Sequence, residues 1–192
     1  MSPEPSQSLP PLRPALQFPP ALLLRAQPVK VVFLDVDGVL TDGGLYFTAE
    51  GETTKRFHTL DGHGLKLIQR AGITPVVISG RDSEPLRKRL SALGVTHMRL
   101  GTEAKLEAAE ELLAELGLTW AEAGAMGDDW PDLPMLRRAA LSVAPPGAHP
   151  EALAVAHLVT MAAGGAGAVR EMCDLLLMAG GHYAALLEEA GE

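Results

Sequence analysis

The sequence predicts an α/β fold of the doubly wound type, with helices on both faces of a mostly parallel sheet. The run 30–36 is largely apolar and leads into carboxylates and glycine, which is typical of a strand buried on both faces. Leucines at helical spacing lie between such runs, and Gly117 is a helix stop signal. This alternation indicates strand–helix–strand crossovers. Further strands are expected at 74–79, 97–100, 123–126, 140–144 and 157–160, and helices at 65–72, 86–93 and 106–116.

One segment departs from this alternation, and it follows the first strand directly. Gly44–Thr48 and Thr53–Phe57 flank the turn-like residues 49–52, which predicts a β-hairpin insertion at about 43–57 with Gly51 at positive φ. The chain has 192 residues, about the length of one domain, and we place the core domain at 28–180. We expect residues 1–27, which are rich in proline, to be a mostly flexible extension with one short docked turn near 22–24. Residues 181–192 form a C-terminal tail.

Composition excludes several classes of function. Apolar residues make up 47% of the chain, whereas the net charge of −8 argues against binding to the nucleic-acid backbone. No stretch reaches the roughly 18 apolar residues that a membrane span needs. The single cysteine, Cys173, is typical of a reducing compartment. We therefore expect a cytoplasmic protein that binds neither nucleic acid nor membrane.

Four polar clusters fall where the predicted strands end or where the next helix begins. In open α/β sheets, ligands bind at the carboxyl ends of the strands, so these clusters are expected to meet at one edge. Any one of them alone would be read as an ordinary turn or helix cap. Their joint occurrence after successive strands favours a functional site. The clusters are Asp35 with Asp37, Ser79–Arg81, Lys105, and Gly127–Asp129.

The residue types in these clusters suit phosphoryl transfer. The carboxylate of Asp35 can attack phosphorus, and Asp37 can protonate the leaving alkoxide and later deprotonate water. Two anions facing a phosphate need a cation, and Asp35, Asp128 and a backbone carbonyl make an oxygen-rich Mg²⁺ site. Lys105 and Ser79 would hold the remaining phosphoryl charge. The sequence thus predicts a magnesium-dependent phosphatase that works through a phospho-aspartate.

These motifs resemble those of the haloacid dehalogenase superfamily: Asp35–Thr41, Ser79, Lys105 and Gly127–Asp132. Over about 29–177 the chain is similar to its cap-less branch, the 3-deoxy-D-manno-octulosonate 8-phosphate phosphatases. Further runs carry that similarity: Asp42–Tyr46, Gly51–Glu52, Lys55-x-Phe57, Asp61–Gly64, Ile78–Arg81 and Gly164–Asp174. The resemblance implies that Asp37 gives its carbonyl to Mg²⁺ beside Asp35 and Asp128. It also implies substrate contacts from Asp37, His58, Thr59, Leu60, Asp61, Gly62, Lys66, Arg81, Arg89 and Lys105.

The same resemblance implies a substrate and a setting. The substrate would be a small phosphorylated sugar acid, 3-deoxy-D-manno-octulosonate 8-phosphate, hydrolysed during lipopolysaccharide precursor synthesis. A phosphatase for a related nine-carbon keto-deoxy sugar acid 9-phosphate, or a non-catalytic homologue, remain alternatives. A signalling receiver domain is excluded, because its acidic pair ends the first strand and its phospho-accepting aspartate follows the third. Here the order is reversed, since Asp35 and Asp37 come first and Asp128 and Asp129 come late.

The spacing between motifs leaves no room for a cap domain. Lys105 follows Ser79 by 26 residues, and only the hairpin follows Asp42. A site open to water needs cover, and the apolar hairpin residues Leu45 and Phe47 would be exposed in a monomer. We therefore expect a homo-oligomer, and the resemblance implies a homotetramer joined through the hairpins. Arg170 and the C-terminal tail are candidates for completing a neighbouring site.

Overall fold

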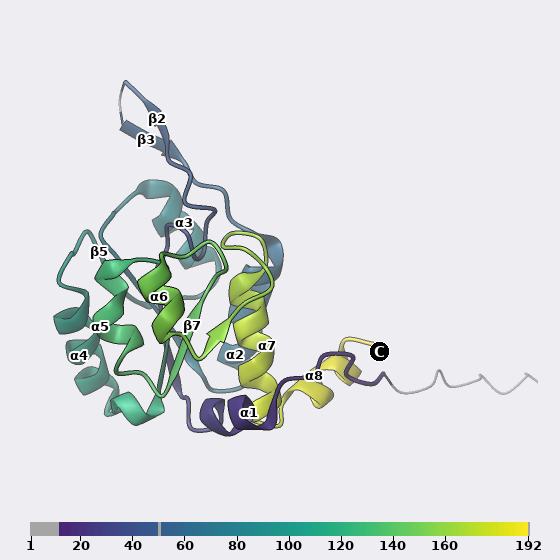
Figure 1. The fold of residues 1–192 in the computed structure, drawn as a ribbon. Coiled ribbons are helices and arrows are strands. Elements are labelled where there is room, and N and C mark those ends of the chain that lie inside the picture. The colour runs from purple at the N-terminus through teal and green to yellow at the C-terminus, as the bar shows by residue number, and fades with distance from the viewer. Residues whose placement is uncertain (1–11, 50, 192) are drawn as a thin grey trace, which may run out of the picture.

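The computed structural model describes residues 12–49 and 51–191, and it places six parallel strands in one sheet (Figure 1). The order is β5-β4-β1-β6-β7-β8, so β1 lies inside the sheet, between β4 and β6. This is the doubly wound parallel sheet that the sequence predicts. The strands are β1 (Val31–Leu34), β4 (Thr74–Ser79), β5 (His97–Leu100), β6 (Ala123–Met126), β7 (Leu141–Ala144) and β8 (Leu158–Val159).

Two apolar cores, one on each face, hold the helices against the sheet. On β1, Val32 and Leu34 belong to one core and Val31 and Phe33 to the other, because successive strand side chains point to opposite faces. The first core packs α1 (Pro20–Ala26), α2 (Thr59–Arg70), α3 (Glu84–Ala92) and α7 (Ala168–Ala179). The second packs α4 (Lys105–Leu116), α5 (Leu133–Leu136) and α6 (Pro150–Val155).

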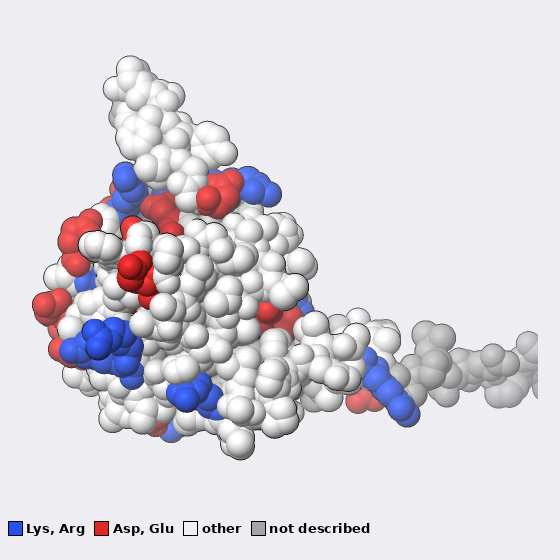
Figure 2. All heavy atoms as spheres, viewed as in Figure 1, with Lys and Arg blue, Asp and Glu red and all other residues white. Residues whose placement is uncertain are grey.

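The predicted hairpin is present but shorter than expected. It consists of β2 (Tyr46–Thr48) and β3 (Gly51–Thr54), which form a separate antiparallel sheet that projects from the body (Figure 1). Gly51 has the expected positive φ, at 117°, but it pairs with Thr48 inside the hairpin ladder rather than lying in the turn. Phe47 is 60% exposed. Among the described residues, the projecting part of the hairpin shows no charged side chain on the face in Figure 2, and the charges gather at its base.

The N-terminal segment differs from the flexible extension expected at 1–27. Residues 20–26 form α1 in place of a short docked turn, with Pro20 at the first helical position, where its missing N–H costs nothing. Leu22 and Leu23 pack on the first core and Ala26 is buried in it. Residues 1–11 lie outside the described part of the chain. The domain boundaries at 27/28 and 180/181 stay predictions.

The C-terminal tail also packs on the body. It forms α8 (Tyr183–Glu189), and two of its side chains, Tyr183 and Leu186, lie against the first core. An ion pair of 2.6 Å joins Arg70 on α2 to Glu189 on α8.

Two absences hold for the residues that the structure describes. The segment from Ser79 to Lys105 holds only α3, β5 and their connections, and the segment after Asp42 holds only the hairpin, so no cap domain is seen. Within 12–49 and 51–191, no helix combines the length and apolarity required to cross a bilayer.

Candidate active site

The fold brings the four predicted clusters to one edge of the sheet. Asp35 follows β1, Ser79 ends β4, and Asp128 follows β6, which are three adjacent strands. Lys105 is the first residue of α4, after β5. The amide of Asp35 donates to the carbonyl of Met126 at 3.0 Å, which extends the β1–β6 pairing to Asp35, the predicted nucleophile. The predicted convergence is therefore confirmed for these side chains.

A buried ion triad lies at the centre of the site. Lys105 Nζ is 2.6 Å from Asp35 Oδ1 and 2.7 Å from Asp132 Oδ1. All three residues are buried, and breaking one partner of a buried ion pair leaves an uncompensated charge that is costly. Lys105 thus fixes the carboxylate of Asp35 while its own position is fixed by Asp132.

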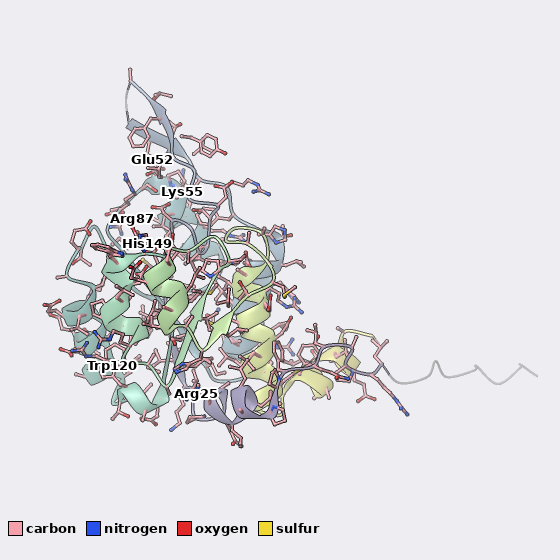
Figure 3. All side chains as sticks on the ribbon, viewed as in Figure 1. Arg25, Glu52, Lys55, Arg87, Trp120 and His149 are labelled. Atoms are coloured by element: carbon pink, nitrogen blue, oxygen red, sulfur yellow. The ribbon has the colours of Figure 1, made fainter. Side chains whose placement is uncertain are left out.

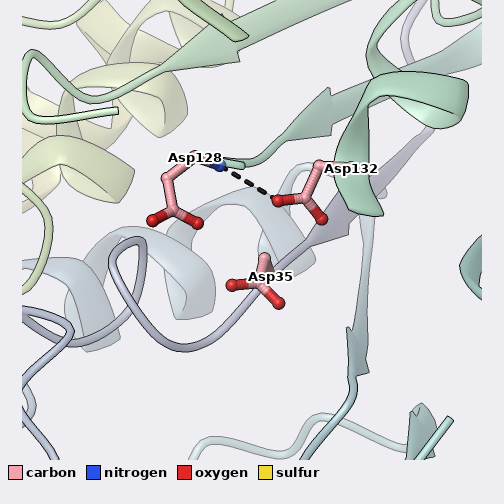
Figure 4. Close-up of side chains that lie close together, drawn as sticks. All are labelled: Asp35, Asp128 and Asp132. Carbon is pink, nitrogen blue, oxygen red and sulfur yellow. Dashed lines mark hydrogen bonds between the residues drawn. The ribbon is translucent and has the colours of Figure 1, made fainter. Parts of the chain in front are cut away.

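Asp132 is a site residue that sequence reasoning missed. Its Oδ2 accepts the backbone N–H groups of Asp128 at 3.0 Å and Asp129 at 3.3 Å, while its Oδ1 binds Lys105. Oxygens of Asp35, Asp128 and Asp132 all lie within 4.8 Å of one another (Figure 4). The sequence did contain a signal, because Asp132 ends the Gly127–Asp132 run that contributed to the family resemblance, although no role was assigned to it.

The electrostatics of this cluster favour a divalent cation. Burial, and then the charge of Asp132, raise the pKa of Asp35 to about 6. Burial, and then the charges of Asp35 and Asp132, raise the pKa of Asp128 to about 7. Burial opposes the charged form of Lys105, but Asp35 and Asp132 outweigh it and raise its pKa to about 12. One ammonium facing three carboxylates leaves uncompensated negative charge.

The donor set also fits such a cation. Carboxylate oxygens are ligands that Mg²⁺ prefers, and Asp35 and Asp128 present theirs side by side. Gly38 has φ 95°, and a Cβ built there would lie 2.1 Å from Asp128 Oδ2. Only glycine at this position of the loop after β1 (residues 35–42, here called the catalytic loop) therefore leaves room for the Asp128 carboxylate.

Asp37 lies at the rim of the site and is held by the hairpin. Its Oδ1 accepts a short hydrogen bond from Lys55 Nζ, and Thr41 Oγ1 lies 3.5 Å from the same oxygen. Its Oδ2 is 3.7 Å from Arg81 Nε. Lys55 was not predicted as a site residue, although the Lys55-x-Phe57 run contributed to the family resemblance.

The phosphoryl-binding role predicted for Ser79 requires a hydroxyl hydrogen that is free to donate. Ser79 is buried at the end of β4, and its Oγ accepts the backbone N–H of Arg81 at 3.2 Å. The carbonyl of Ser79 accepts the N–H of Thr102 at 3.1 Å, which fixes the strand end. Its hydroxyl hydrogen is therefore free to donate to an anion.

The residues expected to contact substrate at the start of α2 have different surroundings. Thr59 and Leu60 are exposed, whereas Asp61 is buried and accepts the backbone N–H groups of Gly167 at 3.3 Å and Arg170 at 2.8 Å. Asp61 thus caps the N-terminus of α7, where a carboxylate is favoured. That role was not foreseen, and its contact with substrate stays a prediction.

The expected basic residues have few partners. Arg89 Nη2 donates to the carbonyl of His58 at 3.4 Å, and Gly62 leaves the room it needs, since a Cβ there would be 2.1 Å from that nitrogen. Arg89 Nε and His58 Nδ1 are buried and have no partner within the described residues. Lys66 is exposed, and no hydrogen bond or ion pair reaches it from that part of the chain. Arg170 instead pairs with Asp174 at 2.7 Å.

A glycine loop from the C-terminal half supports the catalytic loop. A Cβ on Gly164 would lie 1.7 Å from the carbonyl oxygen of Gly38, so the two backbones are in direct contact. Gly165 has φ 62° and its N–H donates to the carbonyl of Val39 at 3.0 Å. These contacts explain why the Gly164–Asp174 run, far along the chain, belongs to the same site as Asp35.

Known proteins match this fold and site. The haloacid dehalogenase-like hydrolase family profile matches residues 98–171. The 3-deoxy-D-manno-octulosonate 8-phosphate phosphatase of Yersinia pestis is 41% identical over 158 residues, 82% of this chain and 84% of that protein. The phosphatase of the same name from Escherichia coli K12 is 40% identical over 83% of this chain and 85% of its own length.

Solved structures agree with these sequence matches. The phosphatase of the same name from Moraxella catarrhalis, in complex with magnesium ion, phosphate ion and KDO, superimposes with a TM-score of 0.86. It is 35% identical, over 88% of this chain and 98% of that one. The cobalt-bound enzyme of Haemophilus influenzae gives a TM-score of 0.81 at 40% identity, over 83% and 93% of the two chains. The chain is thus a phosphatase of the haloacid dehalogenase superfamily and belongs to the family of 3-deoxy-D-manno-octulosonate 8-phosphate phosphatases.

Proposed function

We propose that this phosphatase hydrolyses 3-deoxy-D-manno-octulosonate 8-phosphate to the free sugar acid and inorganic phosphate, with Mg²⁺ as cofactor. The observation that carries the proposal is the Asp35 carboxylate held 2.6 Å from Lys105 Nζ at the end of a central strand. The known activity named for the relatives and the ligands bound in the Moraxella catarrhalis enzyme support the substrate and the metal.

The reaction follows from the placement of two aspartates. An oxygen of Asp35 attacks phosphorus, the phosphorus–oxygen bond to the sugar breaks, and Asp37 gives its proton to the leaving oxygen. Water then attacks the phospho-aspartate, Asp37 takes its proton, and phosphate leaves with regeneration of Asp35. Lys105 and Ser79 hold the non-bridging oxygens. A Mg²⁺ bound by Asp35, Asp128 and the Asp37 carbonyl would offset the repulsion between phosphate and carboxylates.

The basic residues around the start of α2 suit the sugar acid. Arg89 has no carboxylate within ion-pair distance among the described residues, and its partly buried guanidinium is well suited to an anion. Arg81 is half exposed beside Asp37. We assign both to substrate binding, together with His58, Thr59, Leu60, Asp61, Gly62 and Lys66.

Two experiments test this function. Purified enzyme should release phosphate from the eight-carbon substrate with a higher kcat/KM than from a nine-carbon keto-deoxy sugar acid 9-phosphate, and only with Mg²⁺ present. The reverse ranking would assign the enzyme to the nine-carbon substrate. Asp35→Asn keeps the shape of the side chain but removes the nucleophile, so turnover should vanish. Retained turnover in that variant would exclude the covalent mechanism.

We also propose that the enzyme is a cytoplasmic homotetramer that acts in lipopolysaccharide precursor synthesis. The exposed apolar hairpin residues Leu45, Tyr46 and Phe47 support association, because a monomer would leave them in water. Sedimentation at assay concentration should give a tetramer for the wild type and smaller species for Phe47→Ser. An active monomeric wild type would contradict the assembly.

A further inference from the structure

Lys55 is a buried cation at the point where the hairpin meets the active site. It follows β3 directly, and only 1% of its side chain is exposed. Its ammonium group binds Asp37 Oδ1 and lies 3.0 Å from Glu52 Oε1. The second contact is an ion pair without the alignment of a hydrogen bond. Figure 3 shows Glu52 and Lys55 at the base of the projecting hairpin.

Such a placement is costly unless the charge is paired. Transfer of an ammonium group out of water is unfavourable, and carboxylate partners offset the loss of hydration only when their geometry is good. An apolar residue would fill the same space without that requirement. The hydrogen bond to Asp37, the only one that Lys55 makes within the described residues, is therefore the feature to explain.

The two oxygens of Asp37 have different surroundings. Oδ1 accepts from Lys55, which can only donate, and Thr41 Oγ1 lies 3.5 Å from the same oxygen, so a proton on Oδ1 would displace the hydrogen bond from the ammonium group. Asp37 Oδ2 makes no hydrogen bond within the described part of the chain, and its nearest cation is Arg81 Nε at 3.7 Å. Arg81 is half exposed, so Oδ2 lies beside a solvent-accessible side chain, whereas Oδ1 lies against the buried Lys55.

We propose that Lys55 is a positioning residue that anchors Asp37 through Oδ1 and directs Oδ2, with its proton, toward the leaving oxygen. Lys55 touches neither the phosphate nor the sugar in this arrangement and acts through Asp37. The inference rests on the proposed acid/base role of Asp37. It does not depend on which sugar phosphate is the substrate.

The dependence of the rate on the leaving group tests this role. Protonation by Asp37 matters for alkyl phosphates, whose leaving alkoxides are strongly basic, and little for p-nitrophenyl phosphate. In Lys55→Met, kcat/KM for the sugar phosphate should fall about 10- to 100-fold, part of the 10²–10⁴ that general acid catalysis contributes. For p-nitrophenyl phosphate, kcat/KM should fall by less than about threefold. The ratio kcat/KM reports only the steps up to and including the first irreversible one, in which the leaving group departs and the phospho-aspartate forms. Hydrolysis of the phospho-aspartate, which is common to both substrates, therefore does not mask the difference between alkyl and aryl phosphates.

Two further variants separate positioning from folding. The double variant Lys55→Met with Glu52→Gln removes the carboxylate that the single change leaves unpaired, and it should show the same selective loss. Lys30→Met breaks an exposed ion pair with Glu122 and should leave both substrates unaffected. An equal fall for alkyl and aryl phosphates, or no fall, would overturn the proposal. Glycerol phosphate serves as a second alkyl phosphate. If the proposed sugar phosphate is not a substrate, alkyl and aryl phosphates can therefore still be compared.

Discussion

Asp132→Asn should weaken the site in a way that its three hydrogen bonds allow us to estimate. Aspartate accepts from Lys105 with one oxygen and from the amides of Asp128 and Asp129 with the other. Asparagine has one carbonyl oxygen and can satisfy only one of these sides, which leaves buried donors without a partner. Such a loss costs about 1–3 kcal/mol.

The estimate translates into two measurements. At about 2–4 °C per kcal/mol for a domain of this size, the melting temperature should fall by roughly 2–12 °C. Because Lys105 and the Asp128 loop both shift, kcat/KM should fall about 10- to 100-fold, at tenfold for each 1.4 kcal/mol. Thermal denaturation by circular dichroism and a phosphate-release assay measure the two effects.

A third readout distinguishes Asp132 from a merely structural residue. Its charge raises the pKa of Asp35 and of Asp128, so its removal should lower both and shift the pH dependence of Mg²⁺ binding toward acid. Glu84→Gln breaks an exposed ion pair with Lys88 and serves as the control, with no change in any readout. If Asp132→Asn matched that control in melting temperature and pH dependence, Asp132 would not hold the site together.

Two other perturbations follow from the same contacts. First, the apparent affinity for Mg²⁺ should fall as pH drops below about 7, because the raised pKa values of Asp35 (about 6) and Asp128 (about 7) mean that protons must leave before the cation binds. These two carboxyl groups hold more protons in the metal-free fold than in the unfolded chain, so their contribution to its stability should decline as pH rises from about 4 through about 7. Equal Mg²⁺ affinities at pH 6 and pH 8, measured by calorimetric titration, would contradict the expected pH dependence of metal binding. Second, Gly164→Ala should lower kcat/KM by about 100-fold, since its Cβ displaces the catalytic loop by about 1 Å or more. Gly147→Ala, where a Cβ meets nothing within 4 Å, is the control, and equal rates for the two variants would refute the argument.

The fold and the convergence of the candidate catalytic residues could be predicted because local patterns encode them. The apolar run at β1 and the carboxylates after it are adjacent in the sequence, and the sheet order then brings Asp35, Ser79 and Asp128 together. Lys105 could be placed because a helix begins at it. These inferences need only strand periodicity and the rule for ligand sites in open sheets.

The residues that were missed depend on contacts between distant segments. Lys55 meets Asp37 only because the hairpin folds back across 18 residues, and no periodicity signals that contact. Asp61 caps a helix more than a hundred residues away, and no local pattern around Asp61 indicates that structural role. A proline-rich lead suggested flexibility at 20–26, but packing of Leu22 against the first core overrides that composition.

The backbone contact between Gly164 and Gly38 has a consequence for engineering the enzyme. The catalytic loop after β1 rests on a segment more than 120 residues later, so neither half of the chain carries a supported nucleophile by itself. A split enzyme divided between β6 and α7 would regain activity only when its two pieces reassociate through this contact.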